Sequence, residues 1–432
     1  MNNTDTIFAL SSAAGKAGVA VIRISGTDLQ TNAQKFINKT DILARQAYFT
    51  NLRDDDGDLI DQCLILYFRA PNSFTGTDLI EIQCHGAPAV IQKIFDYLST
   101  LGMRMATPGE FSRRAFYNNK MDLANADGLS ALLSARTEKQ RVLALQSMTG
   151  FDSKIYESWR AQMIEISAYS AAILDYPSDD LPVGIGETLY AQTQKLYDDI
   201  TNAINGSTAV RAIQGGFNIV LTGKTNVGKS SLFNRLVGAN RAIVSDIHGT
   251  TRDVISAHLD IDGYLVNLSD TAGIRESIDV IEKIGIEKTN TEIENADLIL
   301  HIIDDELDAP NHIKENEILI INKSDINKFS HKNAISISVL NNNNIDKLLN
   351  LIKEKMHKIM DGVESNLAVN ERTKGLLISA QTDLKSALKQ NNNYDIFAEN
   401  LRGASDFIGK ILGTIEISEI SDRVFNGLCL GK

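Results

Sequence analysis

Hydrophobic residues follow two different spacings along the chain, and the change between them divides the sequence into regions. Up to about residue 118 most apolar runs are short and strand-like, with one helical stretch, Ala89–Leu98, that Gly102 ends. The expected strands here are Thr6–Leu10, Val19–Ile24, Cys63–Phe68 and Leu79–Gln83. This mixture predicts an N-terminal α/β domain over residues 1–118.

From about residue 119 the apolar residues recur at helical spacing over longer stretches. The expected helices are Met121–Ser147, Asp152–Leu174, Glu187–Ile204, Glu364–Lys389 and Ile396–Leu412. A region that alternates strand and helix separates the third of these from the fourth. We therefore expect a helical domain in two parts, 119–210 and 363–432, with a domain inserted at 211–362. The predicted fold class is multidomain, part α/β and part all-α.

The inserted region predicts a mainly parallel sheet, whose loops gather at the C-terminal ends of its strands. Its expected strands are Phe217–Leu221, Tyr264–Leu268, Leu298–Ile303, Ile318–Ile321 and Ala334–Ser338. The spacing Gly-x-x-x-x-Gly-Lys-Ser follows the first strand, from Gly223 to Ser230. Glycines in such a loop let several backbone N–H groups face one oxyanion at a helix N-terminus. Lys229 is expected to reach the β- and γ-phosphates and Ser230 to bind Mg²⁺.

Three further motifs occur in the order expected of a GTP-binding domain. Gly249-Thr250-Thr251-Arg252-Asp253 offers a threonine hydroxyl to magnesium, and Asp270-Thr271-Ala272-Gly273 offers a carboxylate to magnesium and an N–H to the γ-phosphate. In Asn322-Lys323-Ser324-Asp325 the final carboxylate can accept two hydrogen bonds from guanine that adenine does not offer. The nucleotide is therefore expected to be GTP. The expected GTP-binding residues are Asn226, Val227, Gly228, Lys229, Ser230, Ser231, Ser245, Asp246, Ile247, His248, Gly249, Thr250, Thr251, Asp270, Thr271, Ala272, Gly273, Asn322, Lys323, Asp325 and Ser338.

Hydrolysis of GTP needs a group that orients the attacking water and a group that offsets the charge on the transferring phosphoryl group. The residue after Gly273 is Ile274, and an isoleucine side chain cannot orient water. This site must therefore use another residue for that role, or it hydrolyses GTP slowly.

Composition describes an ordinary globular protein of 432 residues, 43% hydrophobic and 23% charged. The chain has no apolar run near 18 residues and no secretory signal pattern, so we expect no membrane contact and a cytoplasmic location. Cys63, Cys84 and Cys429 lack metal-ligand spacing, which argues against a zinc site or a disulfide framework. The net charge of −12, without a block of Lys and Arg, is weak evidence against a broad nucleic-acid surface.

Two short motifs have a functional and a structural interpretation. Asp54–Asp58 contains four carboxylates, but the spacing and the closing glutamate of a calcium loop are missing, so we interpret it as a solvated hairpin turn. Cys84 and His85 are neighbours on an expected strand, where adjacent side chains point to opposite faces. A catalytic Cys–His pair is therefore less favoured than a strand-end turn.

Five further motifs give the chain a resemblance to a known family over nearly its whole length. They are Val21-Ile22-Arg23-Ile24-Ser25-Gly26, Glu81-Ile82-Gln83-Cys84-His85-Gly86, Pro108-Gly109-Glu110-Phe111-Ser112, Asn119-Lys120-Met121-Asp122-Leu123-Ala124 and Cys429-Leu430-Gly431-Lys432. With the GTPase motifs, they make the chain resemble MnmE, also called TrmE, a family of tRNA uridine-modifying GTPases. The resemblance implies an N-terminal folate-binding and dimerisation domain, a discontinuous helical domain and an inserted Ras-like P-loop GTPase domain.

The resemblance also implies a reaction. Members of the family form homodimers and work in a heterotetramer with an FAD-dependent partner of the MnmG type, which carries the FAD. Together they attach an aminomethyl or carboxymethylaminomethyl group to C5 of the wobble uridine of tRNA. The one-carbon donor is a tetrahydrofolate derivative, either 5,10-methylene or 5-formyl.

Several residue roles are carried over from the family. A potassium ion replaces an arginine finger, and its matching ligands are the Asn226 side chain and the backbone of Ser245, Ile247 and Thr250. Glu282 takes the water-orienting role, although without the family we would interpret it as an exposed helix residue. Catalytic roles fall to Glu282, Lys229 and Cys429, magnesium to Ser230 and Thr251, and folate to Arg23, Glu81, Lys120 and Lys432. Cys429 is a candidate nucleophile or a folate-site residue, and Arg and Lys suit the acidic glutamyl tail of folate.

Two other hypotheses stay open from the sequence. A ribosome-assembly GTPase shares the phosphate-loop domain, but that class usually adds an RNA-binding module, and the C-terminal helices contain no GXXG loop of the KH type. A folate-binding scaffold without hydrolysis is the second alternative. The intact Lys229, Ser230, Thr251, Asp270 and Asp325 argue against it.

Overall fold

The computed structural model divides the chain into two compact units. The first comprises Met1–Ser130, Ser147–Ala161 and Ser405–Lys432, and the second comprises Ala131–Gln146 and Gln162–Ala404. The residues that the structure describes are 5–177, 180–243, 255–270, 291–327, 329–360, 367–390, 393–414 and 431. This division into two units does not test the expected domain boundaries at residues 118, 210 and 362, which stay predictions.

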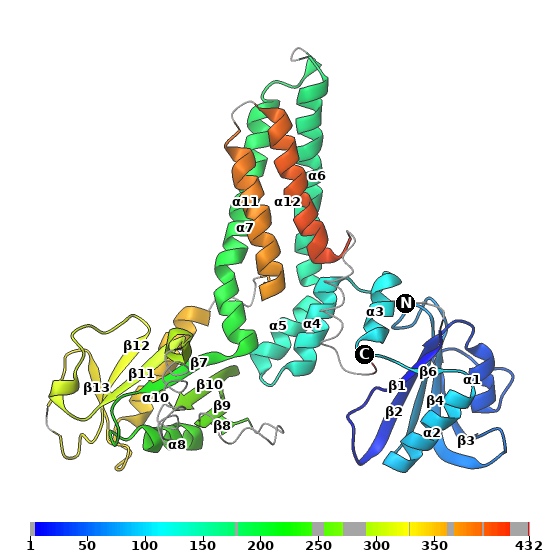
Figure 1. Cartoon of the computed structure of the whole chain (residues 1–432), viewed down its shortest axis with the longest axis horizontal. Coiled ribbons are helices and arrows are strands. Elements are labelled where there is room, and N and C mark those ends of the chain that lie inside the picture. The colour runs from blue at the N-terminus through cyan, green and yellow to red at the C-terminus, as the bar shows by residue number, and fades with distance from the viewer. Residues whose placement is uncertain are drawn as a thin grey trace, which may run out of the picture. The chain divides into compact units, whose positions relative to one another are not determined.

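The first unit contains a six-stranded sheet in the order β3-β4-β5-β2-β1-β6 (Figure 1). Its strands are β1 (Ile7–Leu10), β2 (Ala17–Gly26), β3 (Ala47–Arg53), β4 (Leu59–Phe68), β5 (Asp78–Gly86) and β6 (Arg104–Met105). Every neighbouring pair is antiparallel except β1 and β6. Asp54–Asp58 forms the turn between β3 and β4, where Asp58 N–H donates to Asp54 Oδ1 at 2.9 Å. The expected hairpin turn is therefore confirmed.

Helices cover one face of this sheet. They are α1 (Gln30–Ile37) and α2 (Pro88–Thr100), and the chain continues into α3 (Glu110–Tyr117) and α4 (Leu123–Ser134). Phe36 and Ile94 of the two covering helices share a buried core with Ile22 and Ile82 of the strands. Because side chains alternate along a strand, Arg23 and Glu81 lie on the opposite face, in register across β2 and β5.

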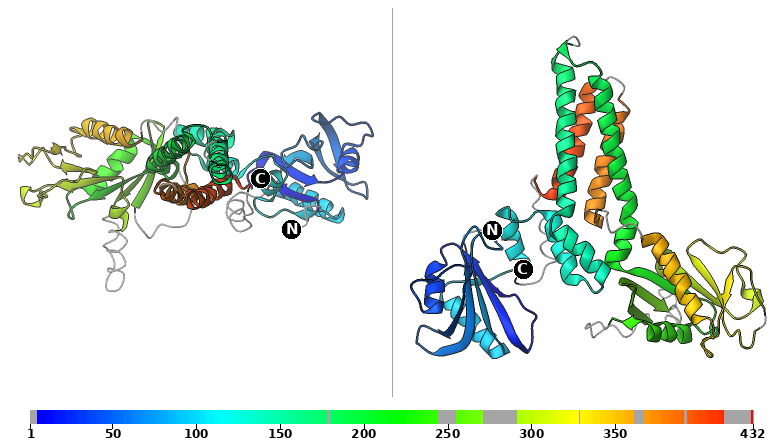
Figure 2. Two further views of the ribbon diagram at one scale, coloured as in Figure 1. Left: turned by 90° about the horizontal axis from the view of Figure 1, so that it is seen from above. Right: turned by 180° about the vertical axis from the view of Figure 1, so that it is seen from behind.

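The helical part of the chain is built from long helices (Figures 1 and 2). These are α5 (Glu138–Met148), α6 (Phe151–Asp175), α7 (Ile185–Gly215), α11 (Glu371–Leu388) and α12 (Tyr394–Leu412). Within the second unit α7 packs beside α11 and α12: the Tyr190 and Phe397 rings are 5.2 Å apart, and Gln381 donates to Thr201 at 2.8 Å. The single helix expected over 121–147 is wrong, because the chain leaves the helix after Ser134 and restarts at Glu138.

The second unit also contains a seven-stranded sheet in the order β13-β12-β11-β7-β10-β9-β8. Its strands are β7 (Phe217–Thr222), β8 (Arg241–Ala242), β9 (Ile255–Ile261), β10 (Tyr264–Asp270), β11 (Leu298–Ile303), β12 (Glu317–Ile321) and β13 (Ala334–Ser336). The neighbours from β13 to β10 pair in parallel, whereas β9 and β8 are antiparallel. The expected mainly parallel sheet is confirmed, and β8 and β9 are additions to it.

In the described part of the chain, one face of the seven-stranded sheet is covered by the C-terminal part of α7, by α8 (Lys229–Ala239) and by α10 (Ile345–Met360). Val210 and Ile213 of α7 belong to the same buried core as Phe217 and Val266 of the strands. The sequence prediction ended α7 at Ile204, but the helix continues to Gly215 because its last turns bury their apolar residues on the sheet. The chain then enters β7 directly.

Candidate functional site

The loop between β7 and α8 depends on two glycines in the left-handed region. Gly223 has φ 136° and Gly228 has φ 102°, where a side chain is strained. A Cβ on Gly223 would also clash with the carbonyl oxygen of Ile302, and one on Gly228 with the side-chain amide of Asn322. The two glycines of the motif are therefore needed for both backbone conformation and close approach.

Lys229 is the first residue of α8 and is 94% buried, with 6% of its surface exposed. Its Nζ donates to the carbonyl oxygens of Gly223 at 2.9 Å and Lys224 at 2.6 Å. The ammonium thus holds the loop in its curled shape at the N-terminus of a helix, where unpaired backbone N–H groups and the helix dipole favour an anion. This arrangement suits phosphate oxygens.

Ser230 and Asp270 meet at the same end of the sheet. Strands β7 and β10 are parallel, with Asp270 in register with Leu221, so the end of β10 lies beside the loop. Ser230 Oγ donates to Asp270 Oδ2 at 2.8 Å, and Asp270 is 1% exposed. A hydroxyl and a carboxylate are hard oxygen ligands of the kind Mg²⁺ prefers. These residues therefore fit a magnesium ion, with phosphate oxygens and water to complete its shell.

The loop after β12 is fastened to the phosphate loop by two side chains. Asn322 is buried, and its Nδ2 donates to Val227 O at 2.8 Å while Val339 N–H donates to its Oδ1 at 3.3 Å. Lys323 Nζ donates to Asn226 O at 2.9 Å. Asp325, in the same loop, lies exposed at the surface. Hydrogen bonds therefore hold the Asn322–Asp325 motif against the phosphate loop, although the two motifs are far apart in the sequence.

Two acidic residues that the sequence reasoning did not select also belong here. Asp304 Oδ2 accepts from Lys323 Nζ at 2.6 Å, and Asp308 forms an ion pair with Lys224 of the phosphate loop. Asp304 comes directly after β11, at the same sheet edge as the motifs. A carboxylate directly after a parallel strand is the sequence feature that could have identified Asp304 as a site residue. Ser338 is 1% exposed, and its Oγ accepts from Asn341 N–H at 3.2 Å.

Many of the expected site residues lie outside the residues that the structure describes. They are Ser245, Asp246, Ile247, His248, Gly249, Thr250, Thr251, Thr271, Ala272, Gly273, Glu282, Cys429 and Lys432. Their roles stay predictions. The structure thus brings together the phosphate loop, Asp270, Asn322 and Lys323.

A second group of expected site residues meets on the first unit. Arg23 donates from Nη2 at 2.7 Å and from Nε at 3.0 Å to Glu81 Oε1, and both side chains are less than a fifth exposed. Arg23 Nη1 also donates to Gly431 O at 3.1 Å, as does Ser11 Oγ at 2.9 Å. The guanidinium lies over the Phe74 ring, 5.4 Å from its centre. Residue 431 of the C-terminal motif is therefore bound to the strand that carries Arg23.

Lys120, the other described folate candidate, lies beside Gly76: a Cβ there would be 3.3 Å from Lys120 Cγ. Its side chain is exposed. The aliphatic part of the Lys120 side chain therefore lies at the loop before β5. Among the described contacts, Lys120 forms no hydrogen bond or ion pair with Arg23 or Glu81.

The Cys84–His85 motif contains no catalytic pair. Cys84 is buried, and burial together with the Asp61 charge raises the pKa of its thiol to about 11. His85 is exposed, and its Nδ1 lies 2.8 Å from Asp61 Oδ1. A buried thiol with a raised pKa is a poor nucleophile, so the structural interpretation is favoured.

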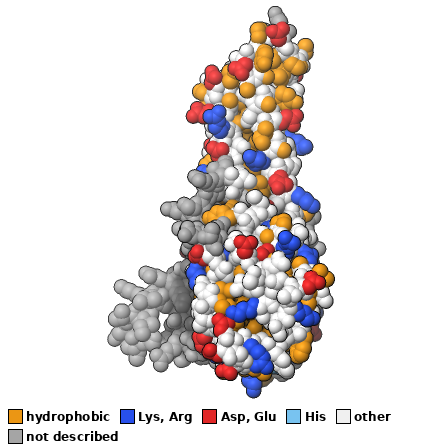
Figure 3. Space-filling model, turned by 90° about the vertical axis from the view of Figure 1, so that its right-hand side faces the viewer, with side chains coloured by type: hydrophobic (Ala, Val, Ile, Leu, Met, Phe, Trp, Pro, Cys, Tyr) orange, Lys and Arg blue, Asp and Glu red, His pale blue; other side chains and the backbone are white. Residues whose placement is uncertain are grey.

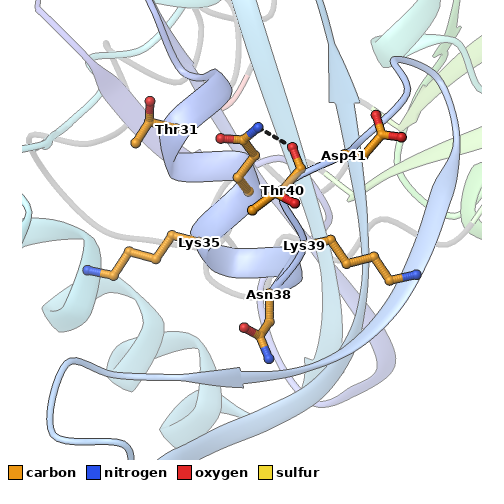
Figure 4. A pocket seen from close by; sticks show the side chains of 7 residues that line it. Thr31, Lys35, Asn38, Lys39, Thr40 and Asp41 are labelled. Atoms are coloured by element: carbon orange, nitrogen blue, oxygen red, sulfur yellow. Dashed lines mark hydrogen bonds between the residues drawn. The ribbon is translucent and has the colours of Figure 1, made fainter.

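A surface hollow of about 640 Å³ lies at the end of α1 (Figure 4). Its two lysines point in different directions (Figure 4): Lys35 pairs with Asp55 at 2.6 Å, and Lys39 lies over the Tyr48 ring at 5.5 Å. The hollow is on the helix-covered side of the sheet, away from Arg23 and Glu81. Its cations do not converge on a common point, so we assign it no ligand.

A parallel strand, a loop with two left-handed glycines and a helix that starts at a buried lysine define a P-loop protein of the α/β class. A family model described as the GTP-binding protein TrmE N-terminus matches residues 6–120, and a model of the MnmE helical domain matches residues 123–429. The chain belongs to the MnmE family of tRNA modification GTPases, also called TrmE.

Relatives support this assignment over the full length. A tRNA modification GTPase MnmE from Dinoroseobacter shibae is 38% identical, covering 99% of this chain and 100% of the relative. One from Aquifex aeolicus is 34% identical over 99% of this chain and 100% of its own. The solved G domain of the T. maritima FeoB iron transporter matches at 23% identity and a TM-score of 0.25, covering 33% of this chain and 98% of that chain. A score this low adds nothing to the assignment.

Proposed function

We propose that the protein is a potassium-activated GTPase that hydrolyses GTP to GDP and phosphate in the course of tRNA modification. With an FAD-dependent partner of the MnmG type, it would add an aminomethyl or carboxymethylaminomethyl group at C5 of the wobble uridine. The observation that carries the proposal is the joined constellation of Lys229, the Ser230–Asp270 pair and Asn322. Family membership supplies the tRNA substrate.

In this proposal each part of the site has one task. Lys229 and the backbone N–H groups at the start of α8 bind the β- and γ-phosphates. Ser230 and Asp270 hold the magnesium ion, which when bound offsets negative charge on the phosphates. Asp325 accepts from the guanine edge, while Asn322 keeps its loop against the phosphate loop. Glu282 orients the attacking water.

Potassium would lie beside the phosphates and offset transition-state charge as a guanidinium would. Asn226 has φ 63° and an exposed side chain, and its carbonyl oxygen is taken by Lys323 Nζ. The backbone of Asn226 is thus fixed while its side-chain amide faces the surface. This supports its role as the side-chain ligand, beside the backbone of Ser245, Ile247 and Thr250.

The Arg23–Glu81 pair supports the tetrahydrofolate site. A carboxylate can accept two hydrogen bonds from the aminopyrimidine edge of a pterin, the donor pair that Asp325 would bind in guanine. Both bonds from Arg23 to Glu81 go to Oε1, so Arg23 holds the carboxylate in place. Among the described residues Oε2 remains to accept one of the pterin donors, and the second donor would have to replace a bond from Arg23. Since Arg23 is engaged in this way, Lys120 and Lys432 are the residues left for the acidic glutamyl tail.

A homodimer is supported by the face of the six-stranded sheet opposite α1 and α2. Helix α3 covers part of this face, where Phe111 packs with Ile7 and Ala9, and the part at β3 and β4 is open. Phe49 is 71% exposed and Leu64 is 39% exposed, and the two are cross-strand partners on β3 and β4. Val19, on β2, is 60% exposed. Apolar side chains gathered on one open sheet face indicate a protein interface. Arg23 and Glu81 share this face, so dimer contact and folate binding would be neighbours.

The described residues on the face drawn in Figure 3 show no large basic area of the kind that binds RNA. On the face shown in Figure 3, Lys and Arg side chains are interspersed with Asp and Glu. Among the described residues no helix is long and apolar enough to cross a membrane. We propose that tRNA is bound jointly with the FAD-carrying partner, in the cytoplasm.

Mass spectrometry of tRNA nucleosides tests the proposal. A strain that lacks this protein is expected to lose the C5-modified wobble uridines, and the wild-type gene to restore them. Lys229→Ala, which removes the phosphate-binding ammonium, should fail to restore them although the protein is made. Unchanged wobble uridines in the deletion strain would refute the proposed function.

A further inference from the structure

The β9–β10 hairpin connects two GTPase motifs to a turn far from the nucleotide. Strand β9 begins just after the Gly249–Asp253 motif, and β10 ends at Asp270, which pairs with Ile255. The turn at the other end, Asp262-Gly263, has φ values of 53° and 84°, as a tight two-residue hairpin turn requires. At about 3.4 Å per residue, this turn lies roughly 20 Å along the strand from Asp270.

The turn contacts helices on two sides. Lys139 N–H, in the first turn of α5, donates to Gly263 O at 3.1 Å, and Lys139 Nζ lies over the Tyr264 ring at 5.4 Å. Asp262 Oδ1 accepts from Lys353 of α10 at 2.8 Å. The first N–H groups of a helix have no partner within the helix. The hairpin therefore supplies a cap for α5 from a distant part of the sequence.

Helix α5 also carries its own capping residues. Thr137-Glu138-Lys139-Gln140 has the Thr-x-x-Gln spacing of a capping box, and Gln140 Oε1 accepts from Thr137 N–H at 3.2 Å. The other half of the box is not made. Thr137 is 6% exposed, and its hydroxyl has no hydrogen-bond partner among the described residues.

An N-cap hydroxyl ordinarily accepts from the second or third N–H of its helix. The second N–H of α5 belongs to Lys139, and it is taken by Gly263 O. Thr137 Oγ and Gly263 O are therefore alternative acceptors for one donor. A buried hydroxyl without a partner is costly, and it would gain a partner if the hairpin turn withdrew.

We propose that this contact between the Asp262-Gly263 turn and Thr137–Gln140, which we name the hairpin cap, is a two-state relay from the nucleotide site to helix α5. In one state Gly263 O caps the helix, and in the other Thr137 Oγ does. Magnesium bound between Ser230 and Asp270 would replace their direct hydrogen bond and shift the end of β10. The proposal rests on the proposed GTPase function, because the nucleotide state has to move Asp270.

Hydrogen exchange of the full-length protein, resolved to the Lys139 amide, tests the relay. Exchange is measured without nucleotide and Mg²⁺, and with GDP, aluminium fluoride and Mg²⁺, with K⁺ present in both states. The Lys139 amide is expected to exchange at least about tenfold differently between the two nucleotide states. In Thr137→Val, which lacks the second acceptor, the hairpin should stay docked, and the difference should fall to less than about twofold.

Thr193→Val is the matched control, since Thr193 is buried in α7 and its hydroxyl donates within that helix to Leu189 O. It should retain the full nucleotide-dependent difference at Lys139. Protection of residues 223–231 by nucleotide, with equal Lys139 exchange in both states, would overturn the relay and leave the proposed function standing. Absence of nucleotide protection at 223–231 would overturn both.

Discussion

At the scale of single residues, Asn322 determines whether the two halves of the nucleotide site stay together. It is 4% exposed and bonds to the phosphate loop through Val227 O and to the loop after β13 through Val339 N–H. Asn322→Ala would leave both of these backbone groups without their partner. We expect a loss of about 2–4 kcal/mol in the free energy of unfolding, measured by urea denaturation, and at least tenfold weaker GDP binding.

Asn341→Ala is the control for that substitution, because Asn341 is exposed in a neighbouring loop. It should change neither quantity measurably. Equal GDP affinity in Asn322→Ala and the wild type would show that the contact to the phosphate loop has no part in nucleotide binding.

Glu282 is the residue on which the rate of hydrolysis is expected to depend. Ile274 cannot orient water, and the resemblance to the MnmE family implies the Glu282 carboxylate for that role. Glu282→Ala should lower kcat by roughly 10²-fold with little change in GTP affinity, as single-turnover kinetics and nucleotide titration would measure. Glu287→Ala, the same change five positions on, should be close to wild type. Weakened GTP binding with an unchanged kcat would instead indicate a structural role.

The sequence predicted individual residues of the phosphate loop well. The glycine spacing identified Gly223 and Gly228, whose left-handed backbone the structure shows. It did not identify Asp304 or Asp308, because a single carboxylate after a strand has no fixed motif. Which atoms Arg23 would bond depends on the register of β2 with β5, and no local pattern determines that register.

At the scale of elements, the start of α3 contains a buried ionic network that makes stability depend on pH. Burial by itself raises the pKa of Glu110, but hydrogen bonds from Arg104 and from Thr107 N–H outweigh burial and lower the pKa to about 2. A lowered native pKa stabilises the fold above the unfolded value near 4.5. That stability is lost as the pH falls from about 5 towards 2.

We therefore expect the free energy of unfolding of the first unit to fall by up to about 3 kcal/mol over this pH range through Glu110. Urea denaturation, followed by fluorescence of Trp159, measures it. Glu110→Gln should be less stable at pH 7 and should show a flatter pH dependence. Glu157→Gln, at an exposed carboxylate of α6 within the first unit, should keep the wild-type slope. An identical slope in Glu110→Gln would contradict the assignment.

Sequence patterns identified long elements better than short ones. Strand β3 was missed because one of its three buried positions is Thr50, which hides the alternation of Tyr48 and Leu52. Helix α1 has polar residues at five of its eight positions, Gln30, Thr31, Asn32, Gln34 and Lys35, so its buried side is too narrow to be recognised. Strand β9 carries His258 and Asp260, and tertiary pairing with β10 decides its conformation.

At the scale of the whole molecule, dimer formation is the property that the open sheet face predicts. Phe49→Asp combined with Leu64→Lys places charges on this face without changing a buried residue. Sedimentation velocity should then show a monomer for the double variant and a dimer for the wild type, with an unchanged far-UV circular dichroism spectrum. Gln92→Lys, which adds a charge at an exposed residue of α2 on the helix-covered side of the sheet, should remain dimeric. A dimeric double variant would exclude this face as the interface.

The position of the strands β7–β13 between the long helices α7 and α11 could be anticipated from the change of hydrophobic spacing along the chain. The domain boundaries at residues 210 and 362 stay predictions. What could not be anticipated is how firmly the helices and the sheet are joined. Helix α7 contributes Val210 and Ile213 to the core of the seven-stranded sheet, and Gln140 of α5 donates to Gln214 O at 2.8 Å. The contact between Gln140 and Gln214 joins residues 74 positions apart, beyond the reach of any local pattern.

Potassium dependence tests the central claim most directly. Phosphate release from GTP by the full-length protein is measured in KCl and in NaCl at equal ionic strength, for the wild type, Asn226→Ala and the exposed neighbour control Thr225→Ala. The account predicts a rate that rises at least tenfold in potassium for the wild type and Thr225→Ala, and a rise that is lost in Asn226→Ala. Equal wild-type rates in the two salts would contradict it.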